Sequence, residues 1–129
     1  MNEHPVSVWH RMVAARDPTG LDQLIDEAAV FYSPVAYAPQ AGRAGVVMYL
    51  TAAFKVFFSP SFRYVREIVG PGDAVLEFET ELDGVVVNGV DLIRWNEAGR
   101  ITEFKVMLRP ARALQVVQQR MAALLQPRS

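Results

Sequence analysis

Asp91 is the residue in this chain whose type and setting are best suited to chemistry. It lies in the stretch from Gly89 to Ile101, where two alternating segments flank a tight polar turn, as is typical of two antiparallel strands. The alternation places the Asp91 carboxyl on the otherwise apolar face of its strand. An acid that faces a core is hydrogen-bonded, protonated or functional, because an unpartnered buried charge is costly.

Burial of this acid predicts an unusual protonation state. Desolvation disfavours the charged form and can raise a carboxyl pKa by up to about 3 to 5 units. We therefore expect Asp91 to be largely protonated at neutral pH and to hydrogen-bond an oxygen atom of a ligand. The alternative is a structural core acid tied to Trp9, a tyrosine or a threonine.

Few other side chains have types and spacings that indicate chemistry. Ser33 has no histidine within sequence reach, so a nucleophilic serine is not expected. The two histidines, His4 and His10, do not make a metal site, and we expect no bound metal. Cysteine is absent, and there is no glycine-rich phosphate loop. Tyr37 lies in a proline-flanked loop that could place its hydroxyl at the mouth of a pocket.

Length and composition limit the class of protein. The 129 residues, of which 51% are hydrophobic, predict a single folded domain over residues 1–129. A net charge of -1 indicates no attraction to nucleic acid or to an anionic membrane. No apolar run approaches the roughly 20 residues needed to span a bilayer. Met1 to Pro5 lacks the basic-then-apolar order of a signal peptide, so by elimination we expect a cytoplasmic protein.

The elements that must position Asp91 follow from hydrophobic periodicity and turn signals. Helical patterns come first and alternating strands follow, which indicates an α+β fold. A curved antiparallel sheet wrapped around the N-terminal helices would make a cone with an open end. The expected helices are Val6–Arg16, a short helix opened by a capping box at Thr19–Asp22, Arg43–Phe58 and a C-terminal helix after Pro110; the expected strands are Ala29–Ser33, Phe62–Val69, Ala74–Leu82, Val85–Trp95 and Arg100–Arg109.

The hairpin at Asp83-Gly84 determines which residues share a face with Asp91. If these two residues form the loop, Leu76 faces Asp91 on the neighbouring strand. With a four-residue loop over Asn96–Gly99, Asp91 meets Phe104 on the next strand. Apart from two threonines, Thr80 and Thr102, the face shared with Asp91 is apolar: Leu76, Phe78, Val87, Ile93, Trp95, Phe104, Val106 and Leu108.

A different loop between the last two strands would change the neighbours of Asp91. A three-residue loop with a bulge would bring Lys105 beside Asp91. We disfavour this register because it would turn Glu103, Lys105 and Arg109 inward.

The opposite, outer face of the sheet mixes charged and apolar side chains. One interpretation is a solvated face with cross-strand charge pairs. That much apolar area on a second face favours a covering surface instead, and we expect a homodimer through the outer face. A two-fold axis would let the acids of one copy meet Arg94 and Lys105 of the other. The outer face is expected to carry Glu77, Glu79, Glu81, Asn88, Arg94, Glu103 and Lys105 beside Val86, Val90, Leu92, Ile101 and Met107.

Three features together resemble the nuclear-transport-factor-2-like superfamily. They are the order of elements, Tyr32-Ser33-Pro34-Val35 ahead of a helix start at Gly42-Arg43, and the stretch from Gly89 to Ile101. More narrowly, the chain resembles the SnoaL-like and ketosteroid-isomerase-like branch over nearly its whole length. This scaffold hosts many functions, so the resemblance implies the fold more strongly than the reaction.

The resemblance assigns Asp91 the position where ketosteroid isomerases keep a protonated acid that donates a hydrogen bond to a developing oxyanion. The position of the general base of those isomerases is Ser33 here, and that of their oxyanion tyrosine is Trp9. An indole donates one hydrogen bond but is no general acid near neutral pH. With one of three chemical groups present, steroid isomerisation by that set is not expected.

Other branches of the superfamily can be compared in the same way. Scytalone-dehydratase-like chemistry uses histidines that reach into the cone, whereas His4 and His10 are both near the start of this chain. Limonene-epoxide-hydrolase-like chemistry uses an arginine and two aspartates, and Val106 takes the position of the second aspartate. SnoaL-like cyclases rely on a single acid in a shaped apolar cavity, a pattern that Asp91 alone satisfies.

These observations predict an apolar cavity that takes a small, mostly hydrophobic molecule bearing a carbonyl or hydroxyl. Asp91 would be the catalytic acid, oxyanion donor or base of a cofactor-free isomerase, cyclase, dehydratase or hydrolase. Two non-enzymatic alternatives stay open: a carrier that uses the same cavity, and an interaction module whose cavity is filled by side chains. The residues expected to bind the ligand are Trp9, Ser33, Tyr37, Phe54, Phe78, Thr80, Phe104 and Val106.

Overall fold

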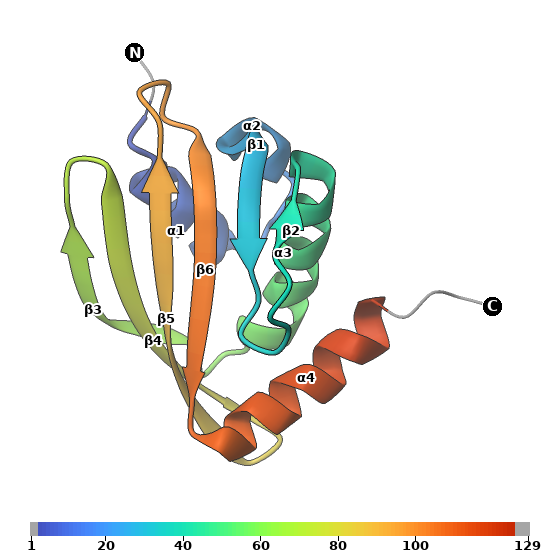
Figure 1. The fold of residues 1–129 in the computed structure, drawn as a ribbon. Coiled ribbons are helices and arrows are strands. Elements are labelled where there is room, and N and C mark those ends of the chain that lie inside the picture. Colours follow the sequence, from blue (N-terminus) through green and yellow to red (C-terminus); the bar gives the residue numbers. More distant parts are fainter. Residues whose placement is uncertain (1–2, 126–129) are drawn as a thin grey trace.

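A bent sheet of six strands forms the frame of the protein (Figure 1). The computed structural model describes residues 3–125, so the first residues of the Met1–Pro5 segment lie outside the described part. All neighbouring strands run antiparallel except β1 and β6, which are parallel, so the expectation of a wholly antiparallel sheet was wrong at this pair. In spatial order the strands are β2 (Gln40–Ala41), β1 (Ile25–Tyr32), β6 (Ile101–Arg109), β5 (Val85–Trp95), β4 (Asp73–Leu82) and β3 (Arg63–Val69).

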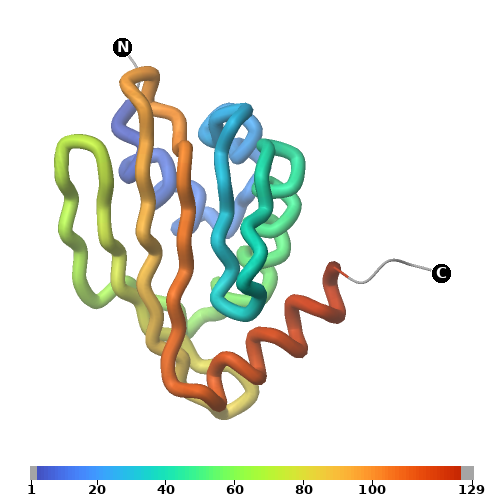
Figure 2. Tube along the Cα trace, viewed as in Figure 1, coloured from blue at the N-terminus to red at the C-terminus, as the bar shows by residue number. Residues whose placement is uncertain are grey.

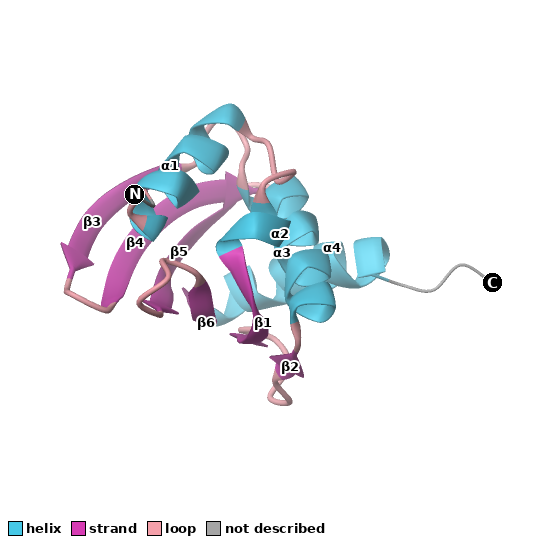
Figure 3. Ribbon diagram, turned by 90° about the horizontal axis from the view of Figure 1, so that it is seen from above, coloured by secondary structure: helices cyan, strands magenta, loops and turns pink. Residues whose placement is uncertain are grey.

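The helices α1, α2 and α3 lie on one side of the curved sheet, which confirms the expected α+β cone (Figure 3). The C-terminal helix α4 follows β6 and packs against α3 and the ends of β5 and β6. No helix within residues 3–125 is long and apolar enough to cross a membrane. The helix bounds are α1 (Pro5–Ala15), α2 (Leu21–Leu24), α3 (Arg43–Phe57) and α4 (Ala111–Leu125).

The ends of the first two helices follow from local hydrogen bonds. The side chain of His4 caps α1 by accepting a hydrogen bond from Val6 N at 3.2 Å, and α1 ends where Arg16 takes a left-handed conformation. The capping box expected at Thr19 was wrong, since Gly20 is the N-cap of the single-turn helix α2 and has no side-chain bond. Thr19 N instead donates to Asp17 Oδ1 at 3.0 Å.

The hairpin between β4 and β5 has the expected register. Asp83 and Gly84 both have positive φ, at 52° and 76°, and this backbone joins two strands that pair Leu76 with Asp91. The hairpin and the start of α4 lie at one end of the molecule, while the β5–β6 loop lies at the other end (Figure 2).

The register expected between β5 and β6 was wrong by two residues. Asp91 pairs with Val106, not Phe104, and the loop is one residue longer than expected because Asn96 Oδ1 accepts a hydrogen bond from Arg100 N at 3.0 Å. A bulge at Thr102 then shifts the ladder. The bulge also turns Ile101 inward, so this residue is buried and does not lie on the outer face as expected.

Candidate functional site

Asp91 lies in the middle of β5 on the inner face of the sheet, as its position in the alternating pattern predicted. Its side chain is only 6% exposed, and its neighbours in register are Leu76 on β4 and Val106 on β6. Within residues 3–125, Asp91 is the only charged side chain that is buried. Lys105 pairs with Leu92 and is not opposite Asp91, so the disfavoured register with a three-residue loop is not observed.

Two hydrogen bonds connect Asp91 to the helix and to the edge strand. The hydroxyl of Tyr64 on β3 donates to Asp91 Oδ2 at 3.3 Å. The indole Nε1–H of Trp9 on α1 donates to the Tyr64 oxygen at 2.8 Å. Three elements that are distant in sequence therefore meet at one partly buried chain of polar atoms.

A tyrosine was among the expected partners of Asp91, but the sequence pattern did not identify it as Tyr64. Counting alternate residues back from Val69, which pairs with the buried Ala74, would put Tyr64 on the outer face. A bulge at Val65 reverses this parity and pairs Tyr64 with Phe78. Within α1, the ring of His10 lies edge-on to Tyr64, with centroids 5.0 Å apart, and its Nε2 contacts the Glu67 carboxylate.

The surroundings change the protonation of both groups. Burial raises the pKa of Asp91 from 3.8 to about 7 and outweighs the Tyr64 hydrogen bond, which lowers it. Burial, and then the nearby Asp91 charge, raise the pKa of Tyr64 well above its usual value of 10. Tyr64 thus keeps its proton near neutral pH, where Asp91 populates both its protonated and its ionised form.

The cavity beside Asp91 is small and lined by aromatic rings. Its volume is about 30 Å³, far below the roughly 300–1,000 Å³ of ligand pockets. Ring contacts occupy the rest of the cone, such as Phe54 against Phe58 with centroids at 4.5 Å and Phe58 against Phe62 at 4.6 Å. Six of the nine predicted site residues border the cavity: Trp9, Phe54, Phe78, Asp91, Phe104 and Val106.

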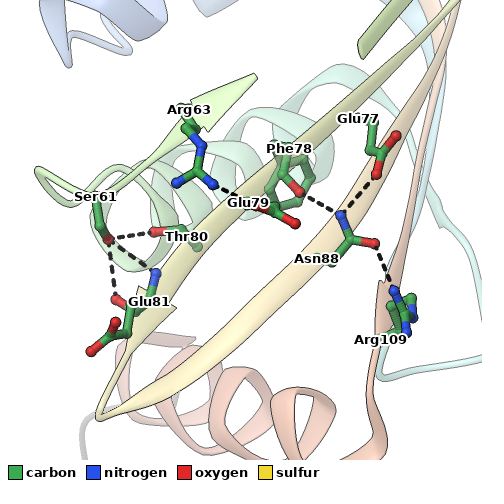
Figure 4. Close-up of polar contacts among 9 residues, drawn as sticks. All are labelled: Ser61, Arg63, Glu77, Phe78, Glu79, Thr80, Glu81, Asn88 and Arg109. Atoms are coloured by element: carbon green, nitrogen blue, oxygen red, sulfur yellow. Dashed lines mark hydrogen bonds and ion pairs between the residues drawn. The ribbon is translucent and has the colours of Figure 1, made fainter. Parts of the chain in front are cut away.

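The other three predicted site residues do not border the cavity. Ser33 Oγ accepts a hydrogen bond from Val35 N at 3.1 Å and so stabilises the turn after β1. Tyr37 is fully exposed, so its hydroxyl is not at the mouth of this cavity. Thr80 is buried, but its Oγ1 contacts Ser59, Ser61 and the Phe57 carbonyl and thereby connects the α3–β3 segment to β4. Figure 4 shows the contact with Ser61.

A larger cleft lies away from Asp91. It has a volume of about 700 Å³ and lies between α1, α2 and the β5–β6 loop. One of its arginines, Arg11, is already paired with Glu3. Within residues 3–125, no three His, Cys, Asp or Glu side chains come together in a way that could hold a metal ion. The buried acid of the small cavity is therefore a better candidate for chemistry than the larger cleft.

The curved sheet, the inner helices and the inward acid define a protein of the nuclear-transport-factor-2-like fold. Residues 6–104 match the SnoaL-like domain family, and the chain belongs to this family. No curated protein matches the sequence.

Solved structures of similar proteins share this fold. A steroid delta-isomerase from Pseudomonas aeruginosa is 36% identical, with a TM-score of 0.89 over 94% of this chain and 88% of that chain. An uncharacterised protein with a cystatin-like fold from Silicibacter pomeroyi DSS-3 is 32% identical, with a TM-score of 0.85 over 92% and 83% of the two chains. The epoxide hydrolase/cyclase-like enzyme SalBIII, which has a role in pyran ring formation in the polyether salinomycin, is 18% identical. Its TM-score is 0.65 over 81% of this chain and 88% of that chain. At this lower identity, the likeness concerns the fold alone.

Proposed function

We propose that this protein binds a small, mostly hydrophobic, oxygen-bearing molecule against Asp91 and acts on it as a cofactor-free isomerase or cyclase. One observation carries the proposal: Asp91 Oδ2 accepts from Tyr64, whereas Asp91 Oδ1 has no hydrogen-bond partner within residues 3–125 and its side chain borders the cavity. Because Oδ1 lacks a partner among the described residues in an otherwise apolar surrounding, a ligand atom that pairs with it would gain a hydrogen bond there. The similarity to a steroid delta-isomerase supports this class of reaction.

The chemistry would rest on Asp91 alone. In its protonated form the carboxyl can donate a hydrogen bond to a developing oxyanion, and in its ionised form it can accept a proton. A pKa of about 7 makes both forms available near neutral pH. The indole of Trp9 is already used in holding Tyr64, and Ser33 is used in a turn, so neither adds a second acid or base.

A ligand of useful size would require the aromatic rings to move. The cavity of about 30 Å³ cannot hold even a single-ring ligand as it stands. Phe58 and Phe62 flank the short connection between α3 and β3 and border the cavity, and Phe58 is the less buried of the two. We propose that these two rings swing outward when a ligand enters, with Asp91 at the bottom of the opened pocket.

The second candidate function is a non-catalytic interaction module with a filled core. The observation that favours it is the same small cavity volume, because rings that fill the cone leave no room for a substrate. In this case the Asp91–Tyr64–Trp9 contacts would serve only to satisfy a buried acid.

The experiment that separates these functions is a ligand panel read by thermal shift and native mass spectrometry. The panel contains steroids, polyketides, terpenoids and aromatic acids, and hits are incubated with the protein and examined for products. The variants are Asp91→Asn and, as a control, Asp22→Asn, which removes an exposed acid on α2. A ligand at about 100 times its Kd adds about 2.7 kcal/mol of stability, which a thermal shift detects easily.

The outcomes of the panel differ for each function. Our proposal expects at least one hit whose stabilisation is retained in Asp22→Asn, lost in Asp91→Asn and accompanied by turnover. Equal stabilisation of all three proteins without product would favour passive binding. A panel without any hit would favour the filled module and would contradict the proposed function.

A further inference from the structure

We infer that Arg16 holds the cavity beside Asp91 shut and thereby determines the size of ligand that the site admits. Arg16 lies at the end of α1 and acts through Phe58, whose ring borders the cavity. The inference rests on the proposed function, since it concerns entry into the same cavity. Arg16 is a positioning residue in this scheme, because it does not itself border the cavity.

The first step locates the way into the cavity. Of the residues that border the cavity, all but Ala53 and Phe58 are buried. Ala53 lies within α3 and has only a methyl group, whereas Phe58 is the residue directly after this helix. The cavity therefore comes closest to solvent between these two residues, and the Phe58 ring is the part that has to turn aside when a ligand enters.

The second step concerns the contacts that hold the Phe58 ring in place. The guanidinium carbon of Arg16 lies 5.7 Å from the centroid of this ring, within the range of a cation–π contact. Arg16 Nη2 donates to the carbonyl oxygen of Ser59 at 3.4 Å, and Nη1 donates to the carbonyl oxygen of Val13 at 2.6 Å. One exposed side chain thus connects the end of α1 to the start of the α3–β3 connection. We call the contacts of Arg16 with Phe58 and Ser59 the Arg16 latch.

The third step compares the latch with the other end of the α3–β3 connection, which is held more firmly. Ser61 Oγ accepts a hydrogen bond from Glu81 N at 3.0 Å and lies 3.2 Å from Thr80 Oγ1 (Figure 4). Phe62, the next residue, is buried. The latch consists of a cation–π contact and a hydrogen bond longer than the usual range for N–H···O. Phe58 is therefore the ring that moves first when the cavity opens.

The fourth step concerns what the latch means for a ligand. While Arg16 holds Phe58 in place, the cavity keeps its volume of about 30 Å³. An open form has to be populated before a larger molecule can bind, and the apparent affinity falls in proportion to the fraction of molecules that are open. Loss of the Arg16 latch raises this fraction for every ligand, whatever atom the ligand presents to Asp91. Arg16 therefore acts on ligand size and not on ligand polarity.

The first arm of the test needs no ligand, because a tryptophan reports the opening. Trp9 is buried, borders the cavity and lies edge-on to Phe58, with centroids 6.3 Å apart. The only other tryptophan is Trp95, so fluorescence is measured in a Trp95→Phe background. We expect Arg16→Gln to raise the rate constant for quenching of Trp9 by acrylamide about threefold or more. Arg11→Gln, which removes another exposed arginine of α1, should leave this rate constant unchanged.

A double variant separates the latch from a merely structural role of Arg16. Phe58→Ala should raise the quenching rate constant at least as much as Arg16→Gln does. Adding Arg16→Gln to Phe58→Ala should change it little, because the latch then has no ring to hold. Urea unfolding of each variant verifies that quenching is measured on folded protein. Unchanged quenching in Arg16→Gln, or an increase by the same factor in the Phe58→Ala background, overturns the inference.

The second arm uses benzene as a probe and follows the NMR signal of the Trp9 indole N–H. We expect Arg16→Gln to bind benzene more tightly than the wild type, by the same factor by which quenching rises. Equal affinities, or binding to neither protein, overturn the inference. Benzene has no polar atom, so its binding does not depend on a hydrogen bond to Asp91. A ligand panel without any hit contradicts the proposed function and leaves the benzene result standing, whereas failure of the Arg16→Gln comparison overturns the latch alone.

Discussion

The buried carboxyl of Asp91 should make the stability of the protein depend on pH. Its pKa is about 7 when folded and near 3.8 when exposed, so the folded state binds the proton more tightly. Stability from this group is fully present below about pH 4, falls as the pH rises toward 7 and is constant above that. At about 1.36 kcal/mol per pKa unit, the total loss is at most about 4 kcal/mol.

Asp91→Asn should remove this decline, because an amide stays neutral throughout. We expect the variant to lose less stability than the wild type between pH 4.5 and pH 8, measured by urea unfolding at each pH. Exposed groups such as Asp83 and Arg120 contribute equally to both proteins and cancel in the difference. Parallel pH curves for the two proteins would show that Asp91 ionises normally in the fold.

The other residues of the site explain why a lone acid is tolerated inside the cone. Asp91 keeps one contact, to Tyr64, and Tyr64 is held in turn by the shorter contact to Trp9. The 3.3 Å contact is long for an O–H···O hydrogen bond, so it offsets only part of the desolvation. A raised carboxyl pKa is the physical consequence of that imbalance.

At the scale of the strands, the face of Asp91 could be predicted because side chains alternate with a period of two. The expected partner Phe104 and the observed partner Val106 lie on the same face of β6, so a register error of two residues did not move the acid. The order of helices and strands was predictable for a similar reason, since long periodic segments and turn residues identify them.

Bulges and side-chain packing could not be predicted from the alternating pattern. The bulge at Val65 brings Tyr64 inward, and the bulge at Thr102 buries Ile101, yet neither sequence position carries a glycine or proline that would indicate it. The volume of the cavity depends on how rings such as Phe54 and Phe58 pack edge to face, which composition does not specify.

Gly89 on β5 should be the position where the sheet is least tolerant of a side chain. A Cβ there would lie 2.6 Å from Leu108 Cδ2, 2.6 Å from Phe78 Cζ and 2.9 Å from the Met107 carbonyl oxygen. Gly89→Ala should therefore destabilise the fold by about 1–3 kcal/mol through overpacking, measured as a shift of the urea midpoint. Because Phe78 borders the cavity, its displaced ring should also weaken binding of any ligand found at Asp91.

Gly72→Ala is the matched control for this strand substitution. A Cβ at Gly72, in the turn before β4, meets nothing within 4 Å. The control should stay within about 0.5 kcal/mol of the wild type, as surface substitutions usually do. Equal effects of the two alanines would show that Gly89 is not required for the close approach of Phe78.

At the scale of the whole molecule, the helices cover one face of the sheet and leave the outer face open (Figure 3). Many charges on the outer face are satisfied within the chain: Arg63 contacts Glu79 at 2.6 Å, and Glu77 accepts from Asn88 at 3.0 Å (Figure 4). We expected the acids of one copy to contact Arg94 and Lys105 of another copy. Such contacts would have to compete with these pairs within each chain. Apolar side chains of the outer face are therefore the better source of association. The most exposed of them are Ile68, Val86 and Met107, with exposed fractions of 61%, 58% and 51%.

We propose that a second copy of this chain covers the outer face. A hollow of about 320 Å³ on this face combines the apolar side chains of Ile68 and Leu92 with charges of both signs, among them Glu103 and Lys105, so the surface is complementary to itself. Met107→Lys should convert a dimer into a monomer in sedimentation at micromolar concentration, because it places a charge in an apolar contact. Raising the salt concentration to 1 M should weaken the wild-type dimer little, since apolar burial is not screened.

Leu124→Lys on α4 supplies the control, because it adds the same charge to an exposed apolar residue on another surface of the molecule. It should leave the dimer intact if the outer face is the contact. A wild-type chain that sediments as a monomer would contradict the second copy altogether. A dimer that survives Met107→Lys but dissociates in Leu124→Lys would place the contact on α4 instead, where Met48 and Leu124 border a smaller hollow of about 270 Å³.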